Sequence, residues 1–246
     1  MIGLLDRSLA EGARVTTDYD TIAHVYAREN ESSLLNAFYN RPAMLNLAGD
    51  VAGRRVLDAG CGSGPLAAGL RDSGAIVTGF DRSAVMIDLA RQRLGADADL
   101  YVADLGEPLP FGDDGFDDVV ASLCLHYLED WAAPLAELRR VLRPGGRLIL
   151  SVPHPSAYLV NYPDRDYFAV TQYSETFTFA GEEGTLTYWH RPLHAMTDAF
   201  TGAGFQIREV SEPPYATDTP RELLPPELGD RSAFVCFLYF VLEAPR

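Results

Sequence analysis

Between residues 55 and 152 the sequence alternates between short apolar segments and amphipathic ones, and this alternation constrains the fold most strongly. The apolar segments predict strands at 55–58, 75–80, 100–102, 117–122 and 147–152. Helices are predicted to begin at Pro65 and to span 83–94 and 131–141. Strands that alternate with helices form a parallel sheet covered on both faces. We therefore expect an α/β fold with one cofactor-binding core at 51–153.

The remaining residues follow other patterns. Residues 1–50 are expected to form a helical cap segment, and 193–246 a helix at 193–202 followed by strands at 205–210 and 233–242. The last two strands lack a crossover helix, which predicts an antiparallel pair. Two alternating stretches, 170–179 and 185–190, predict a β-hairpin within a substrate cap at 154–192. We interpret the whole chain, 1–246, as a single domain.

Composition excludes several classes of function. The chain has 20 basic residues, all of them Arg, against 35 acidic ones, which gives a net charge of −15. The lack of Lys excludes Schiff-base chemistry on a lysine and a P-loop. The negative charge argues against nucleic acid and anionic membrane surfaces as partners. Three scattered cysteines and no signal-peptide pattern favour a cytoplasmic protein without a metal site.

A glycine loop follows the first predicted strand, with glycines at 60, 62 and 64. In an open parallel sheet, ligands bind at this carboxyl edge, and glycine lets the backbone approach them closely. Three acids are expected at the same edge: Asp58 before the loop, Asp81 at the end of the second strand and Asp104 after the third. Asp81 is placed to accept both ribose hydroxyls, and as an exposed acid it is expected to contribute little to folding.

A dinucleotide cofactor does not suit this loop. The dinucleotide fingerprint requires a third glycine where Pro65 stands, and Asp58 would repel a pyrophosphate. S-adenosylmethionine carries a sulfonium, an ammonium and a ribose but no phosphate, so it fits three acids better. A nicotinamide-dependent oxidoreductase and a non-methylating S-adenosylmethionine-binding protein are the alternatives.

Six stretches carry a family resemblance: 56–64, 77–83, 103–104, 116–120, 125–128 and 142–146. Together with residues 18–26, they resemble the class I S-adenosylmethionine-dependent methyltransferases. The most similar group methylates small molecules and includes the quinone-biosynthesis and malonyl-carrier-protein methyltransferases. The resemblance implies a Rossmann-like, mostly parallel sheet of seven strands in the order 3-2-1-4-5-7-6, with strand 7 antiparallel. It also implies methyl transfer from S-adenosylmethionine, with S-adenosylhomocysteine as the product.

The resemblance also implies residue roles. Asp58, Gly60, Gly62, Ser122 and Leu123 would face the methionine portion. Apart from the resemblance, Arg41 could clamp the methionyl carboxylate in a bidentate pair, and an exposed arginine at a helix start is the alternative. The other cofactor residues would be Tyr19, Tyr26, Asp81, Arg82, Met86, Asp104 and Leu105.

The acceptor is expected to be a small apolar or aromatic molecule, because the cap segment 154–192 is rich in Tyr, Phe and Trp. His154 and His190 are the candidate catalytic residues, and the candidate substrate residues are His126, Tyr158, Tyr173 and Trp189. For each histidine a structural role in the interior is the alternative. No pattern specifies an oligomeric state.

Overall fold

Seven strands form one sheet in the order β3-β2-β1-β4-β5-β9-β8 in the computed structural model, which describes residues 19–179 and 182–246 and the side chains of 23–177 and 184–246. Strands β1 to β5 are parallel, and β9 is antiparallel to β5 and β8. Their bounds are β1 Arg55–Ala59, β2 Ile76–Asp81, β3 Asp99–Val102, β4 Phe116–Ser122, β5 Leu142–Pro153, β8 Gln206–Ser211 and β9 Phe237–Glu243. The predicted strand order and antiparallel last strand are confirmed, since β8 and β9 are the sixth and seventh strands of this sheet.

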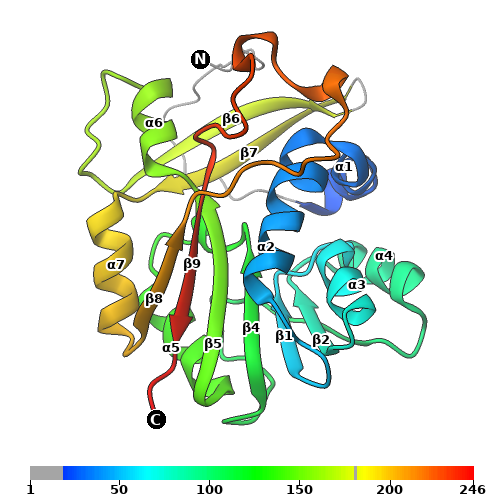
Figure 1. Ribbon diagram of the computed structural model, residues 1–246. Helices are drawn as coiled ribbons and strands as arrows, with labels where there is room; N and C mark the ends of the chain where they lie inside the picture. Colours follow the sequence, from blue (N-terminus) through cyan, green and yellow to red (C-terminus); the bar gives the residue numbers. More distant parts are fainter. Residues whose placement is uncertain (1–18, 180–181) are drawn as a thin grey trace.

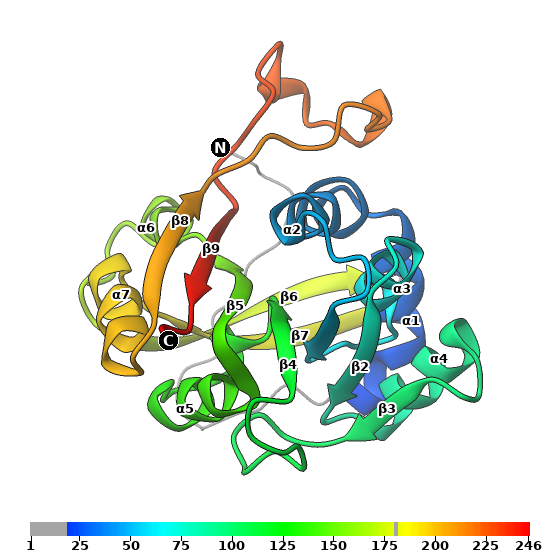
Figure 2. The ribbon, with the colours of Figure 1, turned by 60° about the horizontal axis from the view of Figure 1, so that its bottom comes forward.

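Successive residues of the central strands alternate between two apolar layers. Figure 2 shows the helices on both faces of the sheet. Leu57 and Val119 pack in the layer that contains α5 (Ala132–Val141) and α7 (Leu193–Gly202). Val56 and Val120 pack in the layer that contains α2 (Arg41–Ala48) and α3 (Pro65–Asp72). A strand buried on both faces needs apolar residues at every position, which explains the continuous apolar segments of the sequence. The helix α4 (Ala84–Leu94) packs against β2 and β3.

The strand predicted at 147–152 begins earlier, because residues 142–146 are part of β5. The strand begins at Leu142, which pairs with Phe116 of β4. The register then shifts, and regular pairing begins with Asp118 and Arg147. Gly145 adopts a φ of +81° there, and its N–H donates to the Ala244 carbonyl. The glycines therefore bend the strand without interrupting it.

A hairpin of β6 (Thr171–Phe179) and β7 (Glu182–His190) lies across the end of the sheet to which β4 and β5 run (Figure 1). Helix α1 (Tyr19–Ser32) and helix α6 (Pro155–Asn161) flank it. Leu186 and Tyr188 of β7 form a small apolar cluster with Val25 and Tyr26 of α1. Among the described residues, no helix is long and apolar enough to cross a bilayer.

At the opposite end of the sheet, a buried carboxylate joins three strands. Asp118 of β4 is completely buried and accepts hydrogen bonds from Arg54 at 2.5 and 2.8 Å and from Arg147 at 2.7 and 2.9 Å. Arg147 also donates to the Ala48 carbonyl at the end of α2. Burial raises the pKa of Asp118, but the bonds from Arg147 and Arg54 outweigh this and hold it below its usual value.

We predict that Asp118→Asn lowers the free energy of unfolding by about 3–5 kcal/mol, because two arginines lose their shared counter-ion. Since the pKa of Asp118 is depressed, its contribution is present at neutral pH and is lost as the pH falls through that pKa. Urea unfolding at neutral pH measures the loss. Glu243→Gln, which removes a surface pair with Arg208, is the control and should leave the unfolding midpoint nearly unchanged. Equal effects of the two substitutions would contradict the assignment.

Candidate active site at the carboxyl edge of the sheet

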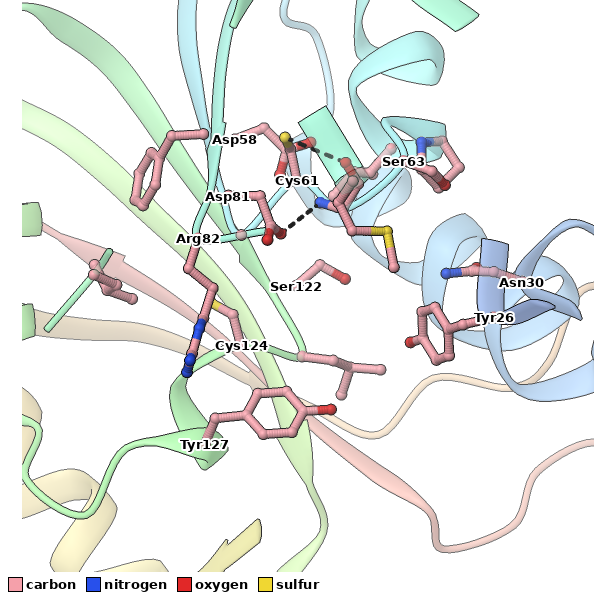
Figure 3. A pocket seen from close by; sticks show the side chains of 18 of the residues that line it. Tyr26, Asn30, Asp58, Cys61, Ser63, Asp81, Arg82, Ser122, Cys124 and Tyr127 are labelled. Atoms are coloured by element: carbon pink, nitrogen blue, oxygen red, sulfur yellow. Dashed lines mark hydrogen bonds between the residues drawn. The ribbon is translucent and has the colours of Figure 1, made fainter. Parts of the chain in front are cut away.

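A cavity of about 200 Å³ lies at the carboxyl ends of β1, β2 and β4 (Figure 3). The chain crosses from one side of β1 to the other there, since β2 pairs with one edge of β1 and β4 with the other. Crossovers that leave in opposite directions open a crevice above the central strands, where α/β proteins bind ligands. The α1, α2 and hairpin elements close the cavity from above.

The glycine loop forms the floor of this cavity. The N–H groups of Gly60 and Cys61 both donate to the Phe80 carbonyl at 2.9 Å, which fixes the loop to the end of β2. Gly60 has a φ of +72°, and a Cβ there would lie 2.8 Å from the Cβ of Cys124. Gly60 is therefore required both for its backbone conformation and for space.

Asp58 is the most unusual residue of the cavity. It is 1% exposed, and no described residue donates a hydrogen bond to either carboxylate oxygen. Burial, together with the charge of Asp81, raises the pKa of Asp58 to about 7; the Ala67 N–H offsets part of this, although its geometry falls outside that of a hydrogen bond. A buried carboxylate without a partner is costly, so this site is built to receive a cation.

Asp81 connects the loop to the next helix. One oxygen accepts from the Gly62 N–H and the other from the Ser83 N–H, each at 2.9 Å. Asp81 is half-buried and is therefore not the exposed acid that the sequence suggests. Its carboxylate joins the glycine loop to the start of α4, and these bonds predict a larger contribution to folding than expected.

Asp104 and its neighbours form the wall beyond β2. Asp104 is exposed and accepts from the Gly106 N–H at 2.8 Å, while Leu105 and Met86 are buried beside it in the cavity lining. The side chain of Arg82 runs from the end of β2 toward the segment that carries Tyr127 (Figure 3).

The end of β4 contributes a strained backbone. Leu123 has a φ of +50°, a conformation that non-glycine residues rarely adopt and that often occurs at functional sites. Its N–H donates to the carbonyl and hydroxyl oxygens of Ser151, both at 3.1 Å. These bonds turn the chain at Ser122 so that both residues line the cavity.

Sequence reasoning missed several residues that line the cavity. The N-terminal segment contributes Asn30, Asn36 and Asn40, the segment after β4 contributes Tyr127, and the hairpin contributes Gln172 and Thr187. For the last two the alternation of the hairpin was a usable signal, because Gln172 pairs with the expected Trp189 and Thr187 stands two residues before it in β7. The three asparagines stand in helices whose orientation no motif indicated.

Thirteen of the candidate site residues line this one cavity: Tyr26, Arg41, Asp58, Gly60, Gly62, Asp81, Arg82, Met86, Asp104, Leu105, Ser122, Leu123 and Trp189. The side chain of Tyr19 lies outside the described residues. These placements are consistent with the predicted roles, which stay predictions.

The other five candidates line a different cavity of about 10 Å³, behind the hairpin: His126, His154, His190, Tyr158 and Tyr173. Trp189 borders both cavities. A space of this size holds about one water molecule, so it cannot receive an acceptor. The structure therefore does not bring these residues to the site where it gathers the other candidates.

The two candidate catalytic histidines are occupied by structural bonds. His154 caps α6 by accepting from the Ser156 N–H at 3.0 Å, and its Nε2 lies 2.9 Å from Glu212. His190 donates from Nε2 to the Tyr167 carbonyl at 2.7 Å and stacks on Tyr158 at 3.8 Å. Burial lowers the pKa of His190 and, for His126, lowers it to about 3. The hydrogen bonds of His154 and His190 argue against either residue as the general base of the reaction.

The sequence profile of a methyltransferase domain family matches residues 57–150. A demethylmenaquinone methyltransferase of Clavibacter sepedonicus is 37% identical over 56% of this chain and 57% of its own length. A ubiquinone/menaquinone biosynthesis C-methyltransferase of Desulfotalea psychrophila is 31% identical over 80% of this chain and 84% of its own length. The chain spans only 57–64% of the length of the first three curated relatives.

Among solved structures, an S-adenosylmethionine-dependent methyltransferase from Mesorhizobium loti is 26% identical, with a TM-score of 0.62. The match covers 82% of this chain and 96% of that one.

We predict that the ligand-free protein becomes less stable as the pH rises from about 4 to about 7. The unfolded chain ionises Asp58 near pH 4, whereas the folded protein keeps it protonated up to a pKa of about 7. The contribution is therefore present at low pH and lost as the pH rises, by at most about 4 kcal/mol. The Asp58→Asn variant lacks this contribution, so the unfolding free energy of the wild type minus that of the variant should fall between pH 4 and pH 7. Parallel pH profiles of the two unfolding free energies would contradict the prediction.

Proposed function

Because the chain belongs to the class I S-adenosylmethionine-dependent methyltransferases, we propose that it transfers a methyl group from this cofactor to a small, largely apolar or aromatic acceptor. The observation that carries the proposal is the buried, unpaired carboxylate of Asp58 beside a glycine loop. A cationic ligand without phosphate satisfies this carboxylate, whereas a pyrophosphate at the same place would be repelled by it.

The residues of the cavity fit the cofactor in three parts. Asp58 faces the positive charge of the methionyl end, and the guanidinium of Arg41, whose buried Nε has no partner among the described residues, suits its carboxylate. The carboxylate of Asp81, which lines the cavity at the end of β2, is proposed to accept hydrogen bonds from the ribose hydroxyls. Met86 and Leu105 offer apolar surface for the adenine, with the Asp104 carboxylate as an acceptor for its amino group.

When bound, the cofactor supplies a methyl group on a sulfonium, and transfer to an acceptor neutralises that charge. The chain's part is to align the acceptor with the methyl group and to exclude water, which can account for a large share of the rate. The hairpin and α1 provide the cover, since Tyr26, Trp189 and Gln172 line the cavity from that side. Histidines 154 and 190 are proposed to hold the cap in place.

The acceptor side of the cavity supports a planar, mostly apolar molecule. Its lining includes Tyr26, Tyr127, Leu128 and Trp189, with polar groups from Gln172 and Thr187. Several relatives carry names that refer to quinone methylation. An aromatic ring of quinone-like size with one or two polar substituents is therefore the acceptor class that we propose.

The proposal predicts that the purified protein binds S-adenosylhomocysteine and not NAD. With methyl-labelled S-adenosylmethionine and a panel of quinols, phenols and metabolite extracts, one product should gain a single methyl group while an equal amount of S-adenosylhomocysteine forms. Calorimetry and mass spectrometry measure the two results. Asp58→Asn is the matched control and should bind at least about tenfold more weakly, having lost a charged hydrogen-bond partner. NAD binding without a response to S-adenosylmethionine would refute the proposal, and binding without turnover would favour a non-methylating protein.

For Asp81→Ala we predict two separate losses. Affinity for S-adenosylhomocysteine should fall by roughly ten- to a hundredfold, because bonds from ribose to a charged group are lost. The melting temperature should fall as well, since Gly62 and Ser83 lose their acceptor. Asp104→Ala, which removes only a local bond to Gly106, should weaken binding without lowering the melting temperature. Unchanged affinity of the Asp81 variant would remove the ribose assignment.

A further inference from the structure

The helical segment that leads into α2 contains a π-helical turn at Asn36–Asn40, where the N–H of Arg41 donates to the Asn36 carbonyl. A π-helical turn adds one residue to the helix, which rotates the following residues by about 100° around the axis. Such turns occur frequently at functional sites. Here Asn40, at the end of the turn, is 5% exposed and lines the cavity.

Hydrogen bonds fix the positions of Asn40 and Arg41. The Nδ2 of Asn40 donates to the hydroxyl of Ser122 at 2.7 Å, at the end of β4. Ser122 lies two residues beyond Val120, which is the register partner of Asp58 in β1. Arg41 donates from Nη2 to the Asn30 carbonyl at 2.7 Å. The Asn40 amide is thereby held over the end of the strand pair that carries Asp58.

Three buried polar groups of this cavity have no partner among the described residues: Oδ1 of Asn40, both oxygens of Asp58, and Nε of Arg41. Two of these groups accept hydrogen bonds and one donates. Leaving such atoms unpaired is costly, and native proteins rarely do so without a ligand or water. The complementary ligand carries a cationic donor and an anionic acceptor close together, as an α-amino acid does.

We propose that Asn40 binds the α-amino acid end of the cofactor: its Oδ1 accepts a hydrogen bond from the ammonium group that Asp58 neutralises. The Nε of Arg41 donates to the adjacent carboxylate. This inference rests on the proposed function and extends it, since it assigns the ammonium group a second acceptor that no sequence motif indicated. Ligands that lack the amino acid end leave these three groups unsatisfied.

The arrangement also couples the cap to the glycine loop. Arg93 of α4 donates to the Ser63 carbonyl at 2.8 Å and forms an ion pair with Glu31 of α1. Segment 30–41 is therefore joined to the glycine loop near one end, through Glu31 and Arg93, and to the end of β4 at the other, through Asn40 and Ser122. A ligand whose ammonium group binds both Asn40 and Asp58 strengthens this second connection.

The test compares wild type and Asn40→Leu in calorimetric binding of three probes. These are S-adenosylhomocysteine, its decarboxylated analogue, which keeps the ammonium, and 5′-methylthioadenosine, which lacks both groups. Asn40→Leu should weaken binding of the first two by about tenfold or more and leave 5′-methylthioadenosine within about twofold. Arg41→Leu should weaken only S-adenosylhomocysteine.

Asn36→Leu is the matched control, because Asn36 lines the same cavity from the same turn but its amide already donates to Ser33. It should leave the ratio of the probe affinities unchanged. Equal weakening of all three probes by Asn40→Leu would mean a structural role and overturn the proposal, as would unchanged S-adenosylhomocysteine binding or unchanged binding of the decarboxylated analogue. Wild-type protein that binds none of the probes would overturn the proposed function itself, together with this inference.

Discussion

The burial of Asp58 without a partner is the constraint around which the rest of the site is arranged. A lone buried carboxylate is tolerated only where the remainder of the fold is stable enough to hold it. The apolar layers on both faces of the sheet supply that stability, and β1 sits between β2 and β4 in the middle of it. The glycine loop, which donates backbone N–H groups to Phe80 and Asp81, lines the same cavity.

A comparison with Asp118 shows how partners determine what a buried carboxylate does. Both residues are fully buried in adjacent strands, β1 and β4. Asp118 is saturated by two arginines, and its pKa is depressed, so it stabilises the amino end of the sheet. Asp58, at the carboxyl end, has a raised pKa, and neither of its carboxylate oxygens accepts a hydrogen bond from a described residue. One end of the same sheet is therefore built for stability and the other for binding.

The sequence predicts the fold well, and it also predicts that the expected cofactor residues gather at one place, because parallel strands bring their carboxyl ends to one edge. Asp58, Asp81 and Asp104 gather there for that reason alone. The same rule places His126 and His154 near this edge, but it does not say which way a side chain points. His154 precedes Pro155 at the first position of α6, so it serves as the helix cap and turns away from the cavity. Asn40 was missed because its position depends on a π-helical turn that apolar spacing does not reveal.

The cap differs most from the sequence-based expectation. Of its nine aromatic residues from Tyr158 to Trp189, Trp189 alone among the described side chains lines the large cavity. Several of the others pack on one another, as Tyr158 does on Tyr162 and Tyr173. A hairpin detached from the main sheet needs such a core of its own, which consumes the aromatic surface. We therefore propose that acceptor choice depends on a few positions, such as Gln172 and Thr187, that lie outside the matched family segment 57–150. The family match covers the glycine loop and the three acids, whereas the side of the cavity that the hairpin closes lies beyond it.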